Sequence, residues 1–324
     1  MNRRHFLNTS GLALLAGSSV FAAASAQASD YPKRAIRLMV GFPPGGSTDG
    51  PVRVLAANAA TILGQPIVVE NRVGAGGVMP AYGLQSAPAD GYTLGIIALG
   101  VFRLPFRTEI KWSPIDDIDY VVGLTGYSFG IVVPTDSPIK TWEDYVAYAK
   151  AHPGELTYAS PGPVTTNHLT MEQISRAAGI ELNHVPYKGS GESMLAVLSG
   201  QVQSAAETSA WAPHVESGKL RLIVVWGDKR MSRFPDVPTL KEKGIDLVQT
   251  SPWGIGVRAG TDPAIIGKLH DAFRQAMQMP NFAEALAVYD MEPMYMDPEQ
   301  YTRFARETMA REKNILEALG LNTR

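Results

Sequence analysis

The chain contains no cysteine among its 324 residues. This absence excludes disulfide bonds, thiolate metal sites and a lipid anchor attached through cysteine. The chain also has little surplus charge, with a formal net charge of −2 at pH 7, and it has no basic runs. We therefore expect neither nucleic acid nor an anionic lipid surface as a partner. A chain of this length can bury a core of its own without disulfides.

Apolar runs long enough to span a membrane are also missing from the sequence. The run at residues 11–24 is shorter than the ~20 residues that a bilayer requires. Arg3 and Arg4 precede it, and a small-x-small sequence ending at Ala28 follows it. This pattern predicts an export signal of the twin-arginine type, cleaved after Ala28, with an ordinary Sec signal as the alternative. Removing residues 1–28 takes away two arginines and no acidic residue, so the net charge becomes about −4. We expect the destination to be the periplasm.

The rest of the chain alternates between strand, turn and helix patterns. Short β-rich runs are followed by stretches whose apolar residues recur at helical spacing, as in residues 51–63. Such alternation predicts parallel α/β units with right-handed crossovers. In the first series, we expect strands at residues 35–40, 67–70 and 92–98, and helices at 51–63 and 78–86.

A second series of the same kind begins after Asp119. Its expected strands are 120–125, 129–133, 156–160, 202–206 and 220–226, and its expected helices are 141–151, 166–178 and 191–199. A strand at 254–257 and helices near 263–278, 281–289 and 298–319 complete the chain. Two series of similar size predict two lobes with a ligand cleft between them. We expect lobe 1 to comprise residues 29–130 with 253–324, and lobe 2 to comprise residues 131–252.

Residues 38–50 are the most informative segment for function, because an apolar strand runs there through a Pro/Gly-rich turn into a helix. The first N–H groups of that helix have no partner within it and lie at the positive end of its dipole. This arrangement predicts a site for an anion such as a carboxylate. The turn contains Pro43, Pro44, Gly45 and Gly46, and the capping candidates are Ser47, Thr48 and Asp49.

The same order of elements occurs once more. A strand at residues 156–160 is followed by a turn at 161–163 and by a helix that opens with polar residues. Ligands bind at the carboxyl ends of strands in open α/β sheets, so two such helix N-termini facing each other could hold one anion. The alternative is a pair of ordinary capped helices with nothing bound. The residues at the start of this second helix are Val164, Thr165, Thr166, Asn167 and His168.

Several segments, taken in order, resemble the substrate-binding receptors of tripartite tricarboxylate transporters, often called Bug-type receptors. The resemblance covers nearly the whole chain after the export signal, and the combination is far more specific than any one segment. The segments are FPPGGSTD at 42–49, VENRVGAGG at 69–77, ADGYTL at 89–94, VPYKG at 185–189, LSGQV at 198–202 and RFPDVPTL at 233–240.

The resemblance implies an α/β fold of the type II periplasmic binding protein class, with a mostly parallel sheet flanked by helices in each lobe. It implies a receptor that closes on a small organic carboxylate and delivers it to the membrane permease of such a transporter. We expect a monomer without enzyme activity, cofactor or metal. One carboxylate is implied to be held by main-chain N–H groups of Gly46, Ser47, Thr48 and Asp49 in lobe 1 and of Val164, Thr165, Thr166 and Asn167 in lobe 2. Phe42 is implied to flank the ligand.

Three further residues are candidates for ligand contact. Where many relatives read Gly-Gln-Val-Asp with an aspartate four residues later, this chain has Gln203 and Glu207. Glu207 either faces the cleft, where it repels a second carboxylate or pairs with a ligand amine, or it caps a segment or meets solvent. Gly77 belongs to a flexible turn expected near the cleft mouth. Ser128 is expected on a hinge strand at the cleft wall.

Two other functions remain open from the sequence. Residues 126–130 match the G-x-S-x-G pattern of a nucleophile elbow, which requires a strand, a sharp turn and then a helix. Residues 131–134 instead have the pattern of a strand, but an exported serine hydrolase using Ser128 remains the alternative from another class. A receptor that signals to a membrane sensor without transport is the third possibility.

Overall fold

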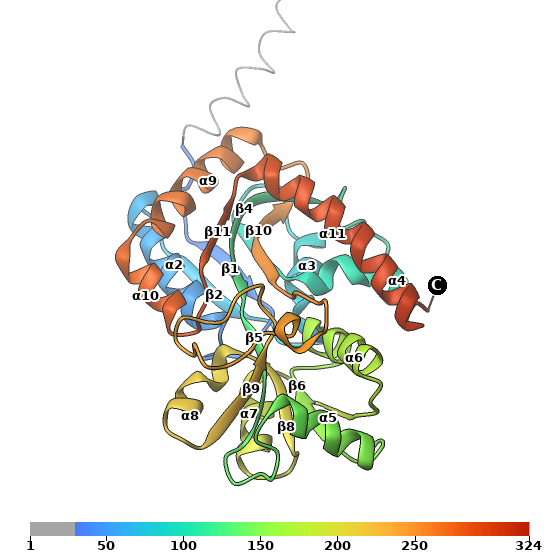
Figure 1. The fold of residues 1–324 in the computed structure, drawn as a ribbon. Coiled ribbons are helices and arrows are strands. Elements are labelled where there is room, and N and C mark those ends of the chain that lie inside the picture. The colour runs from blue at the N-terminus through green and yellow to red at the C-terminus, as the bar shows by residue number, and fades with distance from the viewer. Residues whose placement is uncertain (1–29, 324) are drawn as a thin grey trace, which may run out of the picture.

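The computed structural model describes residues 30–323, which form two lobes stacked one above the other (Figure 1). The expected export signal over residues 1–28 lies outside the described residues. Within residues 30–323, no helix combines the length and the apolar character that crossing a bilayer requires.

Lobe 1 is built on a six-stranded sheet in the order β11-β4-β10-β3-β1-β2. In this sheet β1 pairs in parallel with β2 and β3, whereas β10 runs antiparallel to β3 and β4, and β11 runs antiparallel to β4. Its strands are β1 (Ile36–Val40), β2 (Ile67–Asn71), β3 (Thr93–Ile97), β4 (Ile118–Tyr127), β10 (Ser251–Arg258) and β11 (Pro293–Met296). Its helices are α2 (Asp49–Leu63), η1 (Ala75–Gly77), α3 (Met79–Gln85), η2 (Leu99–Arg103), α4 (Leu104–Arg107), α9 (Pro263–Met277), α10 (Pro280–Ala287) and α11 (Pro298–Leu319).

Lobe 2 is built on a five-stranded sheet in the order β7-β6-β8-β5-β9. Here β6 pairs in parallel with β7 and β8, and β5 runs antiparallel to β8 and β9. Its strands are β5 (Phe129–Pro134), β6 (Thr157–Ser160), β7 (Asn183–Pro186), β8 (Ser204–Thr208) and β9 (Leu220–Val225). Its helices are α5 (Trp142–Ala151), α6 (Thr166–Ala178), α7 (Ser190–Leu198), η3 (Ser209–Trp211), α8 (Ala212–Glu216) and η4 (Lys241–Lys243).

The two-lobed α/β fold is confirmed, but each sheet is mixed rather than mostly parallel. The reason lies in the strands that pass between the lobes. Strands β1 and β4 run toward the cleft, whereas β10 starts at the cleft because the chain returns there from lobe 2. A strand that enters a sheet from the cleft must run against its neighbours that end there. The same reasoning explains why β5, which begins at the cleft, is antiparallel to β8.

Aromatic side chains fill the region where the chain passes between the sheets. β4 ends at Tyr127 in the first sheet, and β5 begins at Phe129 in the second. The ring of Tyr127 lies 5.9 Å from that of Trp253 in β10, and the ring of Phe129 stacks on Trp226 at 5.3 Å. The rings of Tyr127 and Phe129 lie 6.1 Å apart and connect these two buried pairs where the backbone crosses. The division of the chain at residues 130 and 252 stays a prediction.

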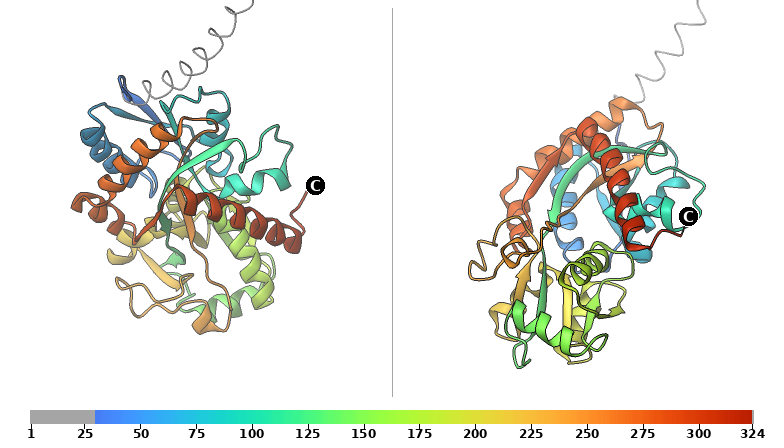
Figure 2. Two further views of the ribbon diagram at one scale, coloured as in Figure 1. Left: turned by 90° about the horizontal axis from the view of Figure 1, so that it is seen from above. Right: turned by 45° about the vertical axis from the view of Figure 1, so that its right-hand side comes forward.

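The helices that carry the cleft are anchored by apolar packing. Helix α2 buries the stripe Val52, Leu55, Ala56 and Ala59 and ends at Gly64, whose φ of 68° suits glycine. Each fully buried leucine or valine side chain contributes about 1.5–3 kcal/mol relative to exposure. Helix α11 runs along lobe 1, and its C-terminal end lies against α6 of lobe 2 (Figure 2). This packing anchors α2 within lobe 1 and places α6 beside α11.

Candidate ligand-binding cleft

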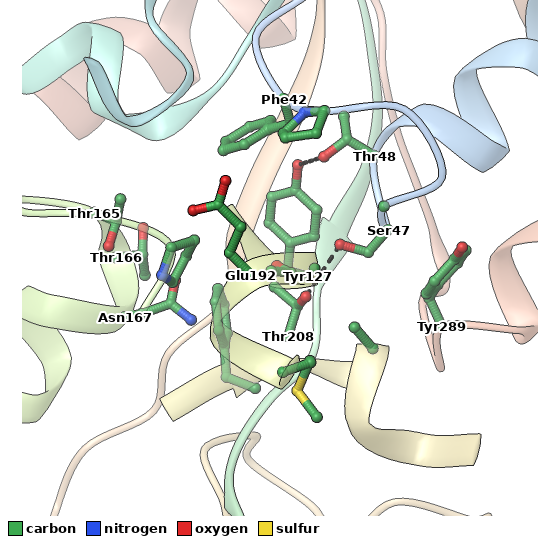
Figure 3. Close-up of a pocket in the computed structure, with 18 of the residues that line it drawn as sticks. Phe42, Ser47, Thr48, Tyr127, Thr165, Thr166, Asn167, Glu192, Thr208 and Tyr289 are labelled. Atoms are coloured by element: carbon green, nitrogen blue, oxygen red, sulfur yellow. Dashed lines mark hydrogen bonds between the residues drawn. The ribbon is translucent and has the colours of Figure 1, made fainter. Parts of the chain in front are cut away.

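A cavity of about 580 Å³ lies between the lobes and is lined by residues of both. Figure 3 shows Phe42, Ser47 and Thr48 on one side of it and Thr165, Thr166 and Asn167 on the other. Gly46 also lines the cavity. Seven of the twelve residues predicted as ligand contacts are therefore brought together in one space. The other five, Asp49, Gly77, Val164, Ser128 and Glu207, lie behind it or elsewhere.

The first side of the cavity is the turn between β1 and α2. The first turn of the helix closes with hydrogen bonds from Gly50 N to Gly46 O and from Val52 N to Thr48 O, each 3.2 Å. The N–H groups at the helix start are therefore available at the cavity side. The Asp49 carboxylate points back into the turn, where Gly45 N, Arg53 Nε and Asn71 Nδ2 donate to it at 2.7–3.0 Å. Burial raises the pKa of Asp49, but these hydrogen bonds outweigh burial and lower the pKa overall.

Gly77 supports the ring of Phe42 from behind. Its φ is +90°, and a Cβ placed on it would lie 2.4 Å from Cζ of Phe42. Only glycine satisfies both the backbone angle and the space. The Phe42 ring lines the cavity, so Gly77 fixes the position of a lining residue without facing the cavity itself.

The second side of the cavity is the N-terminus of α6. Thr165 caps the helix by accepting a hydrogen bond from His168 N at 3.4 Å. Val164 adopts a left-handed conformation with φ +58°, and its N–H donates to Nδ1 of His168 at 3.1 Å. Val164 thus shapes the turn and uses its N–H inside the lobe. Burial, together with the positive charges of Arg107 and Arg103, lowers the pKa of His168 to about 4, so Nδ1 is free to accept this bond at neutral pH.

Several direct contacts join the two lobes at the cleft. The hydroxyl oxygens of Ser47 and Thr208 lie 3.0 Å apart. Pro43 packs on Gly189, where a Cβ would lie 2.9 Å from Cδ of the proline. The structure therefore shows the lobes closed on each other around the cavity.

A buried arginine links both lobes beside the cavity. Nε of Arg103 donates to Glu312 at 2.6 Å, and both side chains are almost completely buried. The guanidinium also donates to Val164 O and to Thr166 Oγ1, each at 3.1 Å. Arg103 of lobe 1 thereby holds the start of α6 in lobe 2.

Glu207 and Ser128 do not line the cavity, and both bind other groups of the protein. Glu207 is fully buried in β8, where its carboxyl group accepts from the hydroxyls of Ser190 and Ser193 and from Thr208 N. Burial raises its pKa to about 7. The Ser128 hydroxyl donates to Asp290 O at 2.6 Å. Strand β5 follows Ser128 directly, whereas a nucleophile elbow would begin a helix there.

Sequence reasoning missed a third strand–turn–helix junction, between β7 and α7. Glu192 and Ser190 from the start of α7 line the cavity, together with apolar residues further along the helix. The segment VPYKG at 185–189 carries the same pattern as the two predicted junctions, so it held the missing signal. Tyr127, whose hydroxyl lies 2.6 Å from Thr48 Oγ1, Arg103, Thr208 and Tyr289 were also missed. Within residues 30–323, no cluster of His, Asp and Glu is suited to hold a metal ion.

Two lobes that close on a cavity lined by helix N-termini define the class of two-lobed solute-binding proteins. The comparisons with known proteins agree. Residues 52–321 match the family described as "Tripartite tricarboxylate transporter family receptor". The chain belongs to this family. The resemblance found in the sequence is thereby confirmed.

Three relatives illustrate the match. The chain is 58% identical over 323 residues to the "UPF0065 protein in gbd 5'region" of Cupriavidus necator, with 99% of each chain covered. The Rhodopseudomonas palustris protein Rpa4515, solved with adipate, superposes with a TM-score of 0.84 at 27% identity, covering 90% of this chain and 99% of the other. MatC from the same organism, solved with malate, has a TM-score of 0.80 at 26% identity, covering 88% and 100%.

Proposed function

We propose that the protein is a periplasmic receptor that captures a small organic carboxylate between its lobes and delivers it to the permease of a tripartite tricarboxylate transporter. The observation that carries this proposal is the convergence of the N-termini of α2 and α6, from opposite lobes, on one cavity. Membership of a receptor family supports it. Bound adipate and malate in two relatives of the same fold support the chemical class of the ligand.

The binding energy would come from N–H groups that are already in position. Each helix N-terminus carries a partial charge of about +0.5, so two of them balance one carboxylate. Hydrogen bonds to an ionised acceptor are roughly twice as strong as neutral ones. The main-chain N–H groups near Gly46, Ser47, Thr48, Thr165, Thr166 and Asn167 are the proposed donors. Contacts from both lobes to one anion favour the closed arrangement over an open one.

The test is thermal unfolding of the purified protein, refolded from denaturant to remove bound ligand, against a panel of carboxylates, amino acids and sugars. A ligand that binds only the folded state adds about 2.7 kcal/mol of stability at a hundredfold excess over Kd. We expect the midpoint to rise with carboxylates. A rise with sugars and none with carboxylates would contradict the proposal.

Two further measurements separate this function from its alternatives. Ser128→Ala should leave carboxylate binding intact, whereas a hydrolase would lose turnover. Uptake of the identified carboxylate by cells should disappear when the receptor gene is deleted, whereas a receptor that only signals would leave uptake unchanged. Export with cleavage near Ala28 and a monomeric state belong to the same proposal, and mass spectrometry of the secreted chain and light scattering test them.

A further inference from the structure

The geometry of the cleft points to a narrower class of ligand. We propose that it takes a molecule with a single carboxylate and an uncharged, mostly apolar body, and that Glu192 is the residue that rejects a second carboxylate. This inference rests on the proposed function, because it assumes that the N-termini of α2 and α6 hold a carboxylate.

A third helix N-terminus reaches the cavity, but it is already faced by the protein's own carboxyl groups. Helix α7 has nine residues and begins at Ser190, which lines the cavity with Gly191 and Glu192. Oε2 of Glu192 accepts a hydrogen bond from Lys188 N at 3.3 Å. From below, the buried Glu207 accepts from the hydroxyl of Ser190 at 2.8 Å. The Glu192 carboxylate therefore places a negative charge at the positive end of the α7 dipole.

Glu192 also extends into the space that a ligand would share. Figure 3 shows its side chain reaching between Thr165 and Thr166 on one side and Thr48 on the other. Its carboxylate is exposed within the cleft. A second carboxylate on a ligand would meet this charge at short range.

The lining supplies no free cation to offset that repulsion. Among the described lining residues, the basic side chains are Arg103 and His214. The guanidinium of Arg103 is committed to Glu312, Val164 O and Thr166 Oγ1, so its charge is already paired. Burial lowers the pKa of His214, which leaves the imidazole uncharged at neutral pH.

The part of the cavity beyond the two predicted sides is apolar. Leu195 of α7 is 68% exposed and Val288, which follows α10, is 53% exposed, although both are large apolar side chains. They belong to opposite lobes and line the same cavity. A ligand with an apolar body would cover them and remove this surface from water. The other apolar lining residues of this region are Met194, Leu198, Ala210 and Pro213.

The experiment is calorimetric titration of the refolded full protein with matched pairs of acids. Hexanoate and adipate differ only in the second carboxylate, as do butanoate and succinate. We expect each monocarboxylate to bind at least about tenfold tighter than its partner, since the second carboxylate and Glu192 carry like charges that repel each other at short range. Affinity should also rise from butanoate to hexanoate, by up to about fourfold for each methylene buried.

Glu192→Gln is the decisive variant, because it removes the charge and keeps the shape. It should raise adipate affinity about tenfold more than hexanoate affinity, because the lost charge acts on two ligand carboxylates in adipate and on one in hexanoate. Glu155→Gln is the matched control, since that carboxylate is 70% exposed on the surface of lobe 2 and does not line the cavity. Glu155→Gln should leave the ratio of hexanoate affinity to adipate affinity unchanged. Circular dichroism of each variant establishes that it is folded.

The possible outcomes separate this inference from the proposed function. Tighter binding of adipate or succinate than of their partners would overturn the inference while leaving the receptor function intact. A preference for 6-aminohexanoate over hexanoate that Glu192→Gln abolishes would also overturn it, because Glu192 would then hold an ammonium group. Failure of every carboxylate to bind would overturn the proposed function itself.

Discussion

Ser47 of lobe 1 and Thr208 of lobe 2 face each other across the cleft, with their hydroxyl oxygens 3.0 Å apart and both residues buried. This bond exists only while the lobes are closed, because its two ends belong to different lobes. A change at either residue therefore acts on the equilibrium between open and closed forms more than on either lobe alone.

Thr208→Val tests this relationship. The substitution keeps the volume and leaves the Ser47 hydroxyl without its partner. A buried hydrogen bond contributes about 0.5–1.5 kcal/mol, so ligand affinity should fall by about twofold to tenfold. Titration calorimetry measures the change. Thr302→Val, which removes a hydroxyl bonded within α11 to Pro298 O, is the control and should leave affinity unchanged. Equal losses in both variants would contradict a role in closure.

The ion pair between Arg103 and Glu312 gives a second prediction. Glu312→Ala leaves the guanidinium buried without a counter-charge, and the free energy of unfolding should fall by about 3–5 kcal/mol. Urea denaturation measures this loss.

Replacing both partners separates stability from function. In the double variant Arg103→Met with Glu312→Leu, the free energy of unfolding should recover most of the loss, because no unpaired charge remains. Ligand affinity should stay reduced, since Val164 O and Thr166 Oγ1 have lost the donor that positions the start of α6. Full recovery of affinity would show that Arg103 only stabilises the fold.

Glu207 makes stability depend on pH. Burial raises its pKa from 4.5 to about 7 in the folded protein. Between these values the folded chain holds a proton that the unfolded chain releases, so the stabilising contribution of this group is lost as the pH rises. The difference in unfolding free energy between the original protein and Glu207→Gln should fall by about 1.4 kcal/mol per pH unit across this window.

Chemical denaturation from pH 4.5 to 7.5 measures that difference. Other titrating groups, such as His168, contribute equally to both proteins and cancel. A difference that stays flat with pH would mean that the carboxyl group of Glu207 is ionised throughout.

Gly77→Ala should damage the cleft through the ring of Phe42. The new methyl group would lie 2.4 Å from Cζ of Phe42 in a backbone with φ +90°. Overpacking costs about 1–3 kcal/mol, and the left-handed backbone adds about 1–2 kcal/mol. Gly179→Ala measures the backbone cost alone, because that residue has φ +62° and a Cβ placed on it would have no other atom within 4 Å. Thermal unfolding should show a larger loss at Gly77, and ligand affinity should fall only there.

The regular elements could be predicted well from the sequence, because their apolar periodicity is strong. Helix α6 was expected at residues 166–178 and occurs at Thr166–Ala178. Strand β11 could not be predicted, since Pro293–Met296 is a short, mostly exposed edge strand without alternation. The short helices η2 and α4 were missed for a similar reason, and the lobe-bridging Arg103 was missed with them.

The position of a side chain relative to the cleft was harder to predict than the element that carries it. Successive residues of a strand point to opposite faces. Thr208 lines the cavity, whereas its neighbour Glu207 lies under α7. A shift of one residue in the assumed register exchanges the two, and the sequence does not determine the register of β8 at its end. The turns rich in glycine and proline were easier to predict, because neighbouring residues in the sequence determine their conformation.

The contact between Pro43 and Gly189 has a mechanical consequence. Gly189 has φ 170°, an extended conformation that any residue adopts, so its backbone does not require glycine. The proline ring alone limits what fits there. A side chain at residue 189 would therefore push the two lobes apart at this contact. Alanine, serine and valine at this position would form a graded series of receptors that differ in how completely they enclose the same ligand, and so in how fast they release it.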